Sequence, residues 1–110
     1  MAKTKKKRAI TDAVEISIRK LGDTPELRAR IEVEKLNIRV AQMIYDARQI
    51  AGLSQKQLAE LIGSKQQVIA RLEDADYEGH SLSMLQRIAV ALGRRIELSM
   101  VPARRRRRPA

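Results

Sequence analysis

The chain has 110 residues and a formal net charge of +10, with one histidine and no cysteine, tryptophan or phenylalanine. Without cysteine there is no disulfide framework, zinc–thiolate site or thiol nucleophile, and the single histidine leaves no HExxH metal site and no partner for Ser–His chemistry. No apolar run approaches the roughly 18 residues of a membrane span, so we expect one cytoplasmic domain with tails that is not an enzyme and binds no cofactor or metal.

The excess positive charge lies in two terminal tails, residues 1–10 and 103–110. The first contains five basic side chains and the second contains the run Arg104–Arg108, whereas basic and acidic side chains balance over residues 9–103. Blocks of like charge stay solvated and are usually disordered. We expect both tails to be disordered and attracted to DNA phosphates, the alternative being that they only increase solubility.

The first predicted element is a short amphipathic helix over residues 12–21. Val14, Ile18 and Leu21 have the spacing i, i+4, i+7 that gathers apolar side chains on one face of a helix. Gly22 follows and is expected to end the helix.

A long helix is predicted from Pro25 to residue 51. Thr24 supplies the N-cap, Pro25 suits the first turn, and no Gly or Pro interrupts the pattern. Asn37 is a weak helix former, which leaves open whether this is one helix or two. We assign residues 11–36 to a helical extension that projects from the domain or packs on a partner.

Two short helices follow, separated by a tight turn. Ser54 and Gln57 have the spacing of a capping box, Gly63 ends the helix they begin, and Ser64 and Gln67 form a second capping box. A turn of about three or four residues forces the two helices to cross steeply, which is helix-turn-helix geometry.

The last predicted elements are a helix and a strand. Ser81 caps the helix and Gly93 ends it, after which residues 95–100 alternate strictly between polar and apolar. A single strand leaves its backbone groups unpaired, so we expect residues 94–102 to pair with a second copy in a two-fold homodimer, the alternative being a frayed tail. The apolar positions of this dimerisation strand are Ile96, Leu98 and Met100.

Residues 48–93 resemble the helix-turn-helix domain of the lambda repressor, Cro and the xenobiotic-response-element regulators. The resemblance is carried by Gly52-Leu53-Ser54-Gln55, Leu58-Ala59, Gly63, Gln66, Ile69, Arg71-Leu72-Glu73, Leu85 and Ile88–Gly93. It implies an all-α, lambda-repressor-like domain over residues 37–93, in which the strand replaces the usual fifth helix.

Within that family the chain is similar to antitoxins of the HigA type, which also have a helical extension before the domain. This similarity implies a RelE/HigB-like ribonuclease toxin as partner and repression of the protein's own operon. Two other functions stay open: a stand-alone repressor of the same fold, and a non-enzymatic bridging module that uses its tails for non-specific nucleic-acid binding.

The helix after Gly63 is the predicted recognition helix, whose first residues lie at base edges in the major groove. Glutamine can donate to and accept from adenine, and lysine suits guanine. By resemblance, Gln66 and Gln67 read bases, Arg71 reaches a base or a phosphate, and Gln55 meets a phosphate. The alternative is that these side chains form only a solvated polar face. The predicted DNA-contacting residues are Gln55, Lys56, Lys65, Gln66, Gln67 and Arg71.

Two further expectations concern an ion pair between the helices and the arrangement of a dimer on DNA. The resemblance predicts a partly buried ion pair between Arg48 and Glu73, which would tie the long helix to the recognition helix. In a two-fold dimer the recognition helices would enter successive major grooves about 34 Å apart, so the double-stranded operator should be palindromic.

Overall fold

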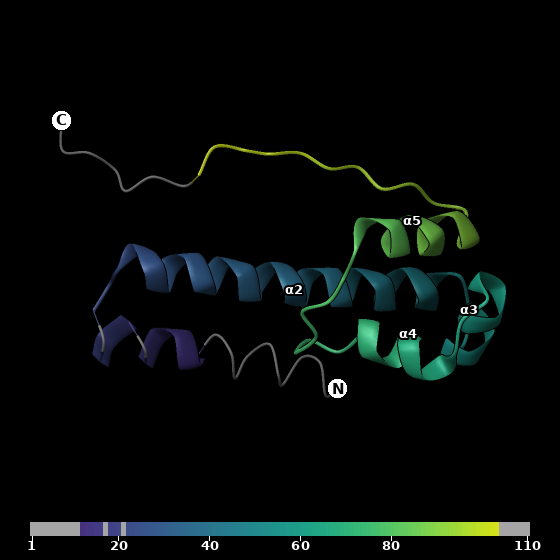
Figure 1. The fold of residues 1–110 in the computed structure, drawn as a ribbon, viewed down its shortest axis with the longest axis horizontal. Helices are drawn as coiled ribbons and strands as arrows, with labels where there is room; N and C mark the ends of the chain where they lie inside the picture. Colours follow the sequence, from purple (N-terminus) through teal and green to yellow (C-terminus); the bar gives the residue numbers. More distant parts are fainter. Residues whose placement is uncertain (1–11, 17, 21, 104–110) are drawn as a thin grey trace.

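The structure is a computed structural model that describes residues 12–16, 18–20 and 22–103. The predicted basic tail at residues 1–10 and the run Arg104–Arg108 lie outside the described residues. Within them the fold is helical, with residues 12–16 and 18–20 forming a first helical segment. The longer helices, shown in Figure 1, are α2 (Pro25–Ile50), α3 (Gln55–Ile62), α4 (Gln66–Leu72) and α5 (Leu82–Ala91).

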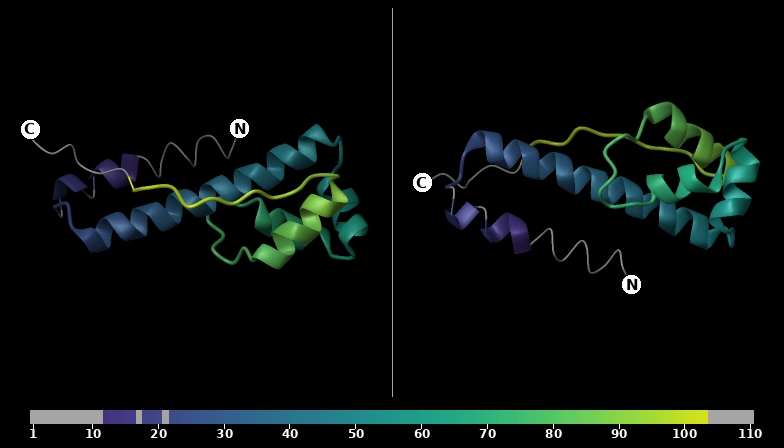
Figure 2. Two further views of the ribbon diagram at one scale, coloured as in Figure 1. Left: turned by 90° about the horizontal axis from the view of Figure 1, so that it is seen from above. Right: turned by 60° about the horizontal axis from the view of Figure 1, so that its bottom comes forward.

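Helix α2 is one continuous helix of 26 residues, so the chain does not break at Asn37. Its start is the predicted one: the Thr24 hydroxyl accepts a hydrogen bond from the backbone N–H of Leu27 at 3.1 Å, and Pro25 stands at the first helical position. The N-terminal half of α2 lies beside the first helical segment, while its C-terminal half belongs to the domain formed with α3, α4 and α5 (Figures 1 and 2).

The core of this domain is formed by apolar side chains from all four helices. Ile44 of α2, Leu58 of α3 and Ile69 of α4 are almost completely buried at its centre. The core is completed by Ala59, Ile62, Leu72, Leu85 and Ile88. Burial of this many large apolar side chains is the main contribution that holds α3, α4 and α5 against α2.

The turn between α3 and α4 has the predicted geometry with one difference. Both hydrogen bonds of the Ser54–Gln57 capping box are present, at 2.8 and 3.1 Å, and Gly63 ends α3 with a φ of 68° that favours glycine. The second predicted capping box, at Ser64, is wrong. The Ser64 backbone N–H closes α3 by donating to the Ala59 carbonyl at 2.8 Å, so Lys65 takes the N-cap position of α4 without a side-chain cap.

The predicted strand at residues 94–102 is absent from the described chain, which contains no strand. Residues 94–103 extend back beside α2 without regular secondary structure (Figures 1 and 2), with Ile96 half-buried against the core and Leu98 and Met100 exposed. A strand needs a neighbouring strand for its ladder of hydrogen bonds, and the described residues supply none. The alternating pattern alone therefore does not produce a strand in one copy of the chain.

No helix in the described part of the chain combines the length and the apolar character needed to cross a membrane.

Candidate nucleic-acid interface

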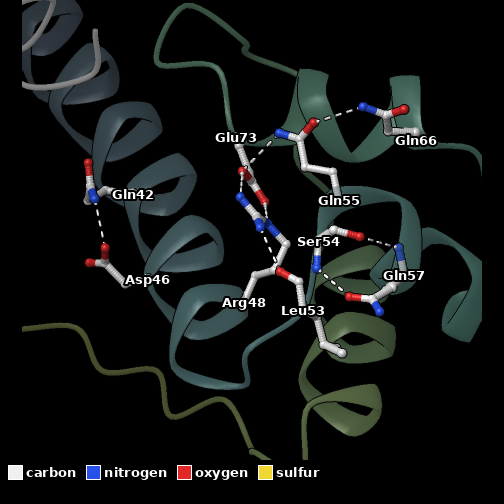
Figure 3. A network of polar contacts seen from close by, with 9 residues as sticks. All are labelled: Gln42, Asp46, Arg48, Leu53, Ser54, Gln55, Gln57, Gln66 and Glu73. Atoms are coloured by element: carbon white, nitrogen blue, oxygen red, sulfur yellow. Dashed lines mark hydrogen bonds and ion pairs between the residues drawn. The ribbon is translucent and has the colours of Figure 1, made fainter. Parts of the chain in front are cut away.

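The N-terminal ends of α3 and α4 are joined by a contact between two glutamines. Gln55 is the first residue of α3 and Gln66 is the first residue of α4. The Gln66 Nε2 donates to Gln55 Oε1 at 3.4 Å, as Figure 3 shows. The sequence predicted both as DNA-contacting residues, and the fold brings them together on one edge of the domain.

A buried ion pair holds this edge in place. Arg48 of α2 donates from Nε and Nη2 to the two carboxylate oxygens of Glu73, at 2.6 and 3.0 Å (Figure 3). The Arg48 side chain is 7% exposed and that of Glu73 is 1% exposed. The hydrogen bonds and charge of Glu73 raise the pKa of Arg48 above its ordinary value, against the effect of burial. The ion pair that the sequence predicts between these two residues is present in the structure.

The ion pair and the glutamine contact are parts of one network. The Gln55 Nε2 donates to Glu73 Oε1 at 3.2 Å, so Glu73 accepts hydrogen bonds from both α2 and α3. Arg48 also donates from Nη1 to the Leu53 carbonyl at 2.7 Å, which fixes the loop before α3. The network therefore sets the position of α3 relative to α4, and it holds Gln55 and Gln66 in defined orientations.

The remaining predicted site residues surround this edge with exposed side chains. Lys65 is the N-cap of α4, Gln67 is its second residue and Arg71 lies in its last turn, while Lys56 follows Gln55 in α3. All four are exposed, whereas Gln55 is half-buried. A glutamine amide has two N–H donors and an acceptor oxygen, so Gln66 retains one N–H and its oxygen for a ligand after donating to Gln55.

Two bracing residues were missed by the sequence analysis because nothing local marks them. Arg87 of α5 donates to the Ile62 carbonyl at the end of α3. His80, whose ring lies edge-on to that of Tyr77, donates from Nε2 to the Leu72 carbonyl at 2.7 Å, at the end of α4. Each satisfies a carbonyl that has no partner inside its helix. Both contacts join residues far apart in the sequence or across a loop, where spacing gives no signal.

Acidic side chains gather at the opposite end of α4 from Gln66. The loop that follows α4 brings Glu78 and Asp76 to Glu34 of α2, and the hydrogen bond with Glu78, burial and both negative charges raise the pKa of Glu34 above its ordinary value of 4.5. The described residues contain no group of three or more His, Asp or Glu side chains arranged to hold a metal ion. The edge at Gln55 and Gln66 is therefore set apart from the acidic loop.

Comparison with known proteins identifies the part of the chain that carries this interface. A helix-turn-helix family model matches residues 44–98, which is half of the chain and includes α3, α4 and α5. A protein of Haemophilus influenzae described as an uncharacterized HTH-type transcriptional regulator is 40% identical over 75 residues, covering 66% of this chain and 74% of that protein. No solved structure matches the chain.

Proposed function

The chain belongs to the helix-turn-helix family, and from that membership we propose that it is a sequence-specific DNA-binding transcriptional repressor. The observation that carries the proposal is the contact between Gln55 and Gln66, backed by the buried pair Arg48–Glu73. The first residues of two helices form this polar edge, and a buried ion pair holds them in place. The edge is therefore preorganised for a ligand, whereas a merely solvated surface would be mobile. The name given to the Haemophilus influenzae relative agrees with a regulatory role.

In this proposal α4 enters the major groove. Lys65, Gln66 and Gln67 face base edges there, where an adenine matches a glutamine amide and a guanine matches a lysine. Gln55, at the start of α3, meets a phosphate with the N–H that it does not donate to Glu73. Lys56 adds a backbone contact, and Arg71 reaches a base or a phosphate one turn along α4. Occupation of the operator by the protein then blocks transcription.

Substitution of Gln67 tests the base-reading role, because Gln67 takes no part in the network that positions α3 and α4. Gln67→Ala should lower the preference for a selected operator over random DNA by about 1–3 kcal/mol, which is roughly 5- to 150-fold, while the salt dependence stays unchanged. Gln86→Ala, the same change at an exposed position of α5, is the matched control. Competition binding measures both. Unchanged preference in the Gln67 variant would remove α4 from the DNA interface.

We further propose that the repressor acts as a homodimer on a palindromic operator. Helix-turn-helix proteins place two recognition helices in successive major grooves, about 34 Å apart, when a two-fold axis relates them. The test is the operator sequence itself: selection from random DNA should return two inverted half-sites whose centres are about one helical turn apart. A single unrepeated half-site would contradict this part of the proposal.

We also propose that the protein is the antitoxin of a toxin–antitoxin pair, with the toxin bound by residues 11–36. The supporting observation is a cleft of about 530 Å³ lined by the first helical segment, α2 and Ala103. Val14, Ile18 and Ile31 give it apolar walls, and charged side chains surround them. An apolar cleft with a charged rim suits a helix or strand of another protein better than DNA. The charged residues are Arg28, Glu32 and Lys35.

Two isoleucines of the first helical segment provide a matched test of the toxin site. Ile18 lines the cleft, whereas Ile16 is 49% exposed and does not line it. Each variant is co-expressed with the product of the adjacent reading frame, and cell growth is measured. Ile18→Glu should abolish neutralisation and Ile16→Glu should preserve it, with operator binding intact in both. If neither substitution changes growth, the stand-alone repressor becomes the better description.

A further inference from the structure

Helix α2 has a second row of apolar side chains that its own fold covers only in part, because Val40 and Ala47 are half-buried. The face that packs on the core and on the first helical segment contains Ile31, Ile38, Ala41 and Ile44, all buried. A different set of apolar side chains recurs at alternating intervals of four and three residues along the whole helix, and we call it the α2 stripe. Its members are Ala29, Val33, Leu36, Val40, Met43, Ala47 and Ile50.

The stripe is open to solvent in its N-terminal half. Val33 is 56% exposed and Leu36 is 58% exposed, although both are large apolar side chains. The chain after α5 packs Ile96 near Met43 and Ala47 and so covers part of the C-terminal half, and it continues beside α2 to Ala103, which lines the cleft with Glu32 and Lys35. The open part of the stripe is therefore centred on Val33 and Leu36.

The order of side chains in the stripe is that of a two-stranded coiled coil. An alternating four–three spacing is the heptad pattern, in which two positions per seven residues face a partner helix. Val33 and Val40 occupy one of these positions, and Leu36 and Met43 occupy the other. A helix with the same pattern is a second copy of α2.

The charges beside the stripe select the direction and register of pairing. Glu32 and Arg39 precede Val33 and Val40 on the same flank, and within one chain Glu32 Oε1 lies 3.8 Å from Lys35 Nζ in an exposed ion pair. An antiparallel pair with Val33 opposite Leu36 of the second copy sets each Glu32 beside the other copy's Arg39, so two ion pairs form. Sliding the helices by one heptad instead opposes Arg39 with Arg39 and brings Glu32 against an acidic side chain, Asp46.

A parallel pair lacks this complementarity. It would direct Arg39 toward position 44 of the second helix, where Ile44 is 2% exposed and packed in its own core. The antiparallel register therefore satisfies the apolar stripe and its charged flank together, and the parallel one does not.

We propose that two copies of the chain associate through the α2 stripe as an antiparallel helix pair with Val33 opposite Leu36. This inference rests on the proposed homodimeric repressor and assigns its interface. The two-fold axis passes near residues 34 and 35, and Arg48 lies about 13 residues along α2 from it.

Substitutions of two leucines, one inside the stripe and one outside it, test the interface in the full-length chain. Leu36→Gln places an amide in the centre of the pair twice, once from each copy, and should raise the dimer dissociation constant by roughly 100-fold. Leu61→Gln is the matched control, because Leu61 is 59% exposed on α3 and outside the stripe. Sedimentation equilibrium gives both constants. Equal dimerisation of the two variants overturns the proposal.

A charge exchange tests the register. Glu32→Arg and Arg39→Glu each create like-charge contacts and should weaken the dimer separately, whereas the double variant should restore it at low salt. If each substitution weakens the dimer only by disturbing the structure of α2, the two losses of dimer stability should add in the double variant instead of cancelling. Failure of the double variant to recover dimerisation overturns the register.

The direction of pairing can be read from disulfides, since the natural chain has no cysteine. A Val33→Cys chain mixed with a Leu36→Cys chain should give a crosslinked heterodimer, and neither chain should crosslink efficiently alone. Crosslinking of each chain with itself would indicate a parallel pair and overturn the proposal. A monomeric mass at micromolar concentration would also overturn it, while base reading is judged separately by the Gln67 variant.

Discussion

Arg48 joins several parts of the edge at Gln55 and Gln66. It makes two hydrogen bonds to Glu73 and one to the Leu53 carbonyl, and its guanidinium lies 5.3 Å from the centre of the Tyr45 ring. A guanidinium can satisfy a carboxylate with two parallel bonds and still have donors left, which a lysine cannot. An arginine at this position therefore links α2, the loop before α3 and the end of α4 at once.

Breaking this pair from one side should be strongly destabilising. Arg48→Met leaves the Glu73 carboxylate buried without its countercharge, and the free energy of unfolding should fall by about 3–5 kcal/mol. Urea denaturation measures the change. The double variant Arg48→Met/Glu73→Met should regain part of the loss because no buried charge remains unpaired. A double variant that loses the sum of both single effects would show that the two residues do not act as a pair.

Glu34 should make stability depend on pH. Its pKa is raised by Glu78, by burial and by the charge of Asp76, while Arg30 acts in the opposite sense. A raised pKa means that the folded chain binds this proton more tightly than the unfolded chain. The contribution of Glu34 to stability is therefore fully present below pH 4.5 and is lost as the pH rises through the raised pKa.

Glu34→Gln removes the repulsion that Glu34 feels at neutral pH. The variant should have a higher free energy of unfolding than the wild type at pH 7, and the difference should disappear below pH 4.5. Denaturation at a series of pH values measures it, with Glu60→Gln at an exposed site of α3 as the control. A variant that is less stable than the wild type at pH 7 would contradict this account.

Among the four helices α2 to α5, α4 is the one with an incomplete start. Thr24, Ser54 and Ser81 cap α2, α3 and α5 with side-chain oxygens, but Lys65 at the N-cap of α4 makes no such bond. A lysine cannot accept a hydrogen bond from the backbone N–H groups of the first turn. If Lys65 contacts DNA, its positive charge favours binding in the groove, whereas the missing side-chain cap lowers the stability of α4.

Lys65→Ser separates these two effects. The serine should cap α4 and raise the free energy of unfolding by roughly 0.5–2 kcal/mol, while operator binding weakens because a positive charge is lost. Thermal denaturation and DNA binding are measured on the same variant. Ser54→Ala, which removes the cap of α3, should lower stability by about 1 kcal/mol and calibrates the scale. A more stable variant with full affinity would exclude Lys65 from the DNA contact.

For the protein as a whole, the proposed function assigns attraction to DNA and recognition of sequence to different segments. The net charge of +10 is carried by the terminal runs, and residues 9–103 are neutral. The edge at Gln55 and Gln66 is held in place by a neutralised ion pair rather than by excess charge. Affinity for any DNA and preference for one sequence should therefore change independently.

Removal of Arg104–Arg108 should weaken binding to operator and random DNA alike. Each phosphate contact that is lost should flatten the slope of log affinity against log salt by about 0.9. Binding at several salt concentrations measures this, and the Gln67→Ala variant serves as the contrast, with altered preference and an unaltered slope. Loss of preference on removing the arginines would mean that they contact bases.

Local sequence signals predicted the helices and the turn of this protein. Caps such as Thr24 and Ser54 and breaks such as Gly63 act within four residues of themselves, so they can be read without the rest of the fold. The family resemblance added the pair Arg48–Glu73, and it also predicts the candidate site on α3 and α4. These parts of the fold could be predicted because their causes are short-range or shared with known proteins.

The remaining features depended on contacts between segments distant in the chain. The strand predicted at 94–102 lacks a neighbouring strand, Ser64 is used by α3 instead of capping α4, and Glu34 meets Glu78 across 44 positions of sequence. A backbone group bonds to whichever partner the packed helices bring near, and a carboxylate responds to charges that surround it in space. Composition and spacing determine which helices form, and burial of their apolar faces decides which side chains meet.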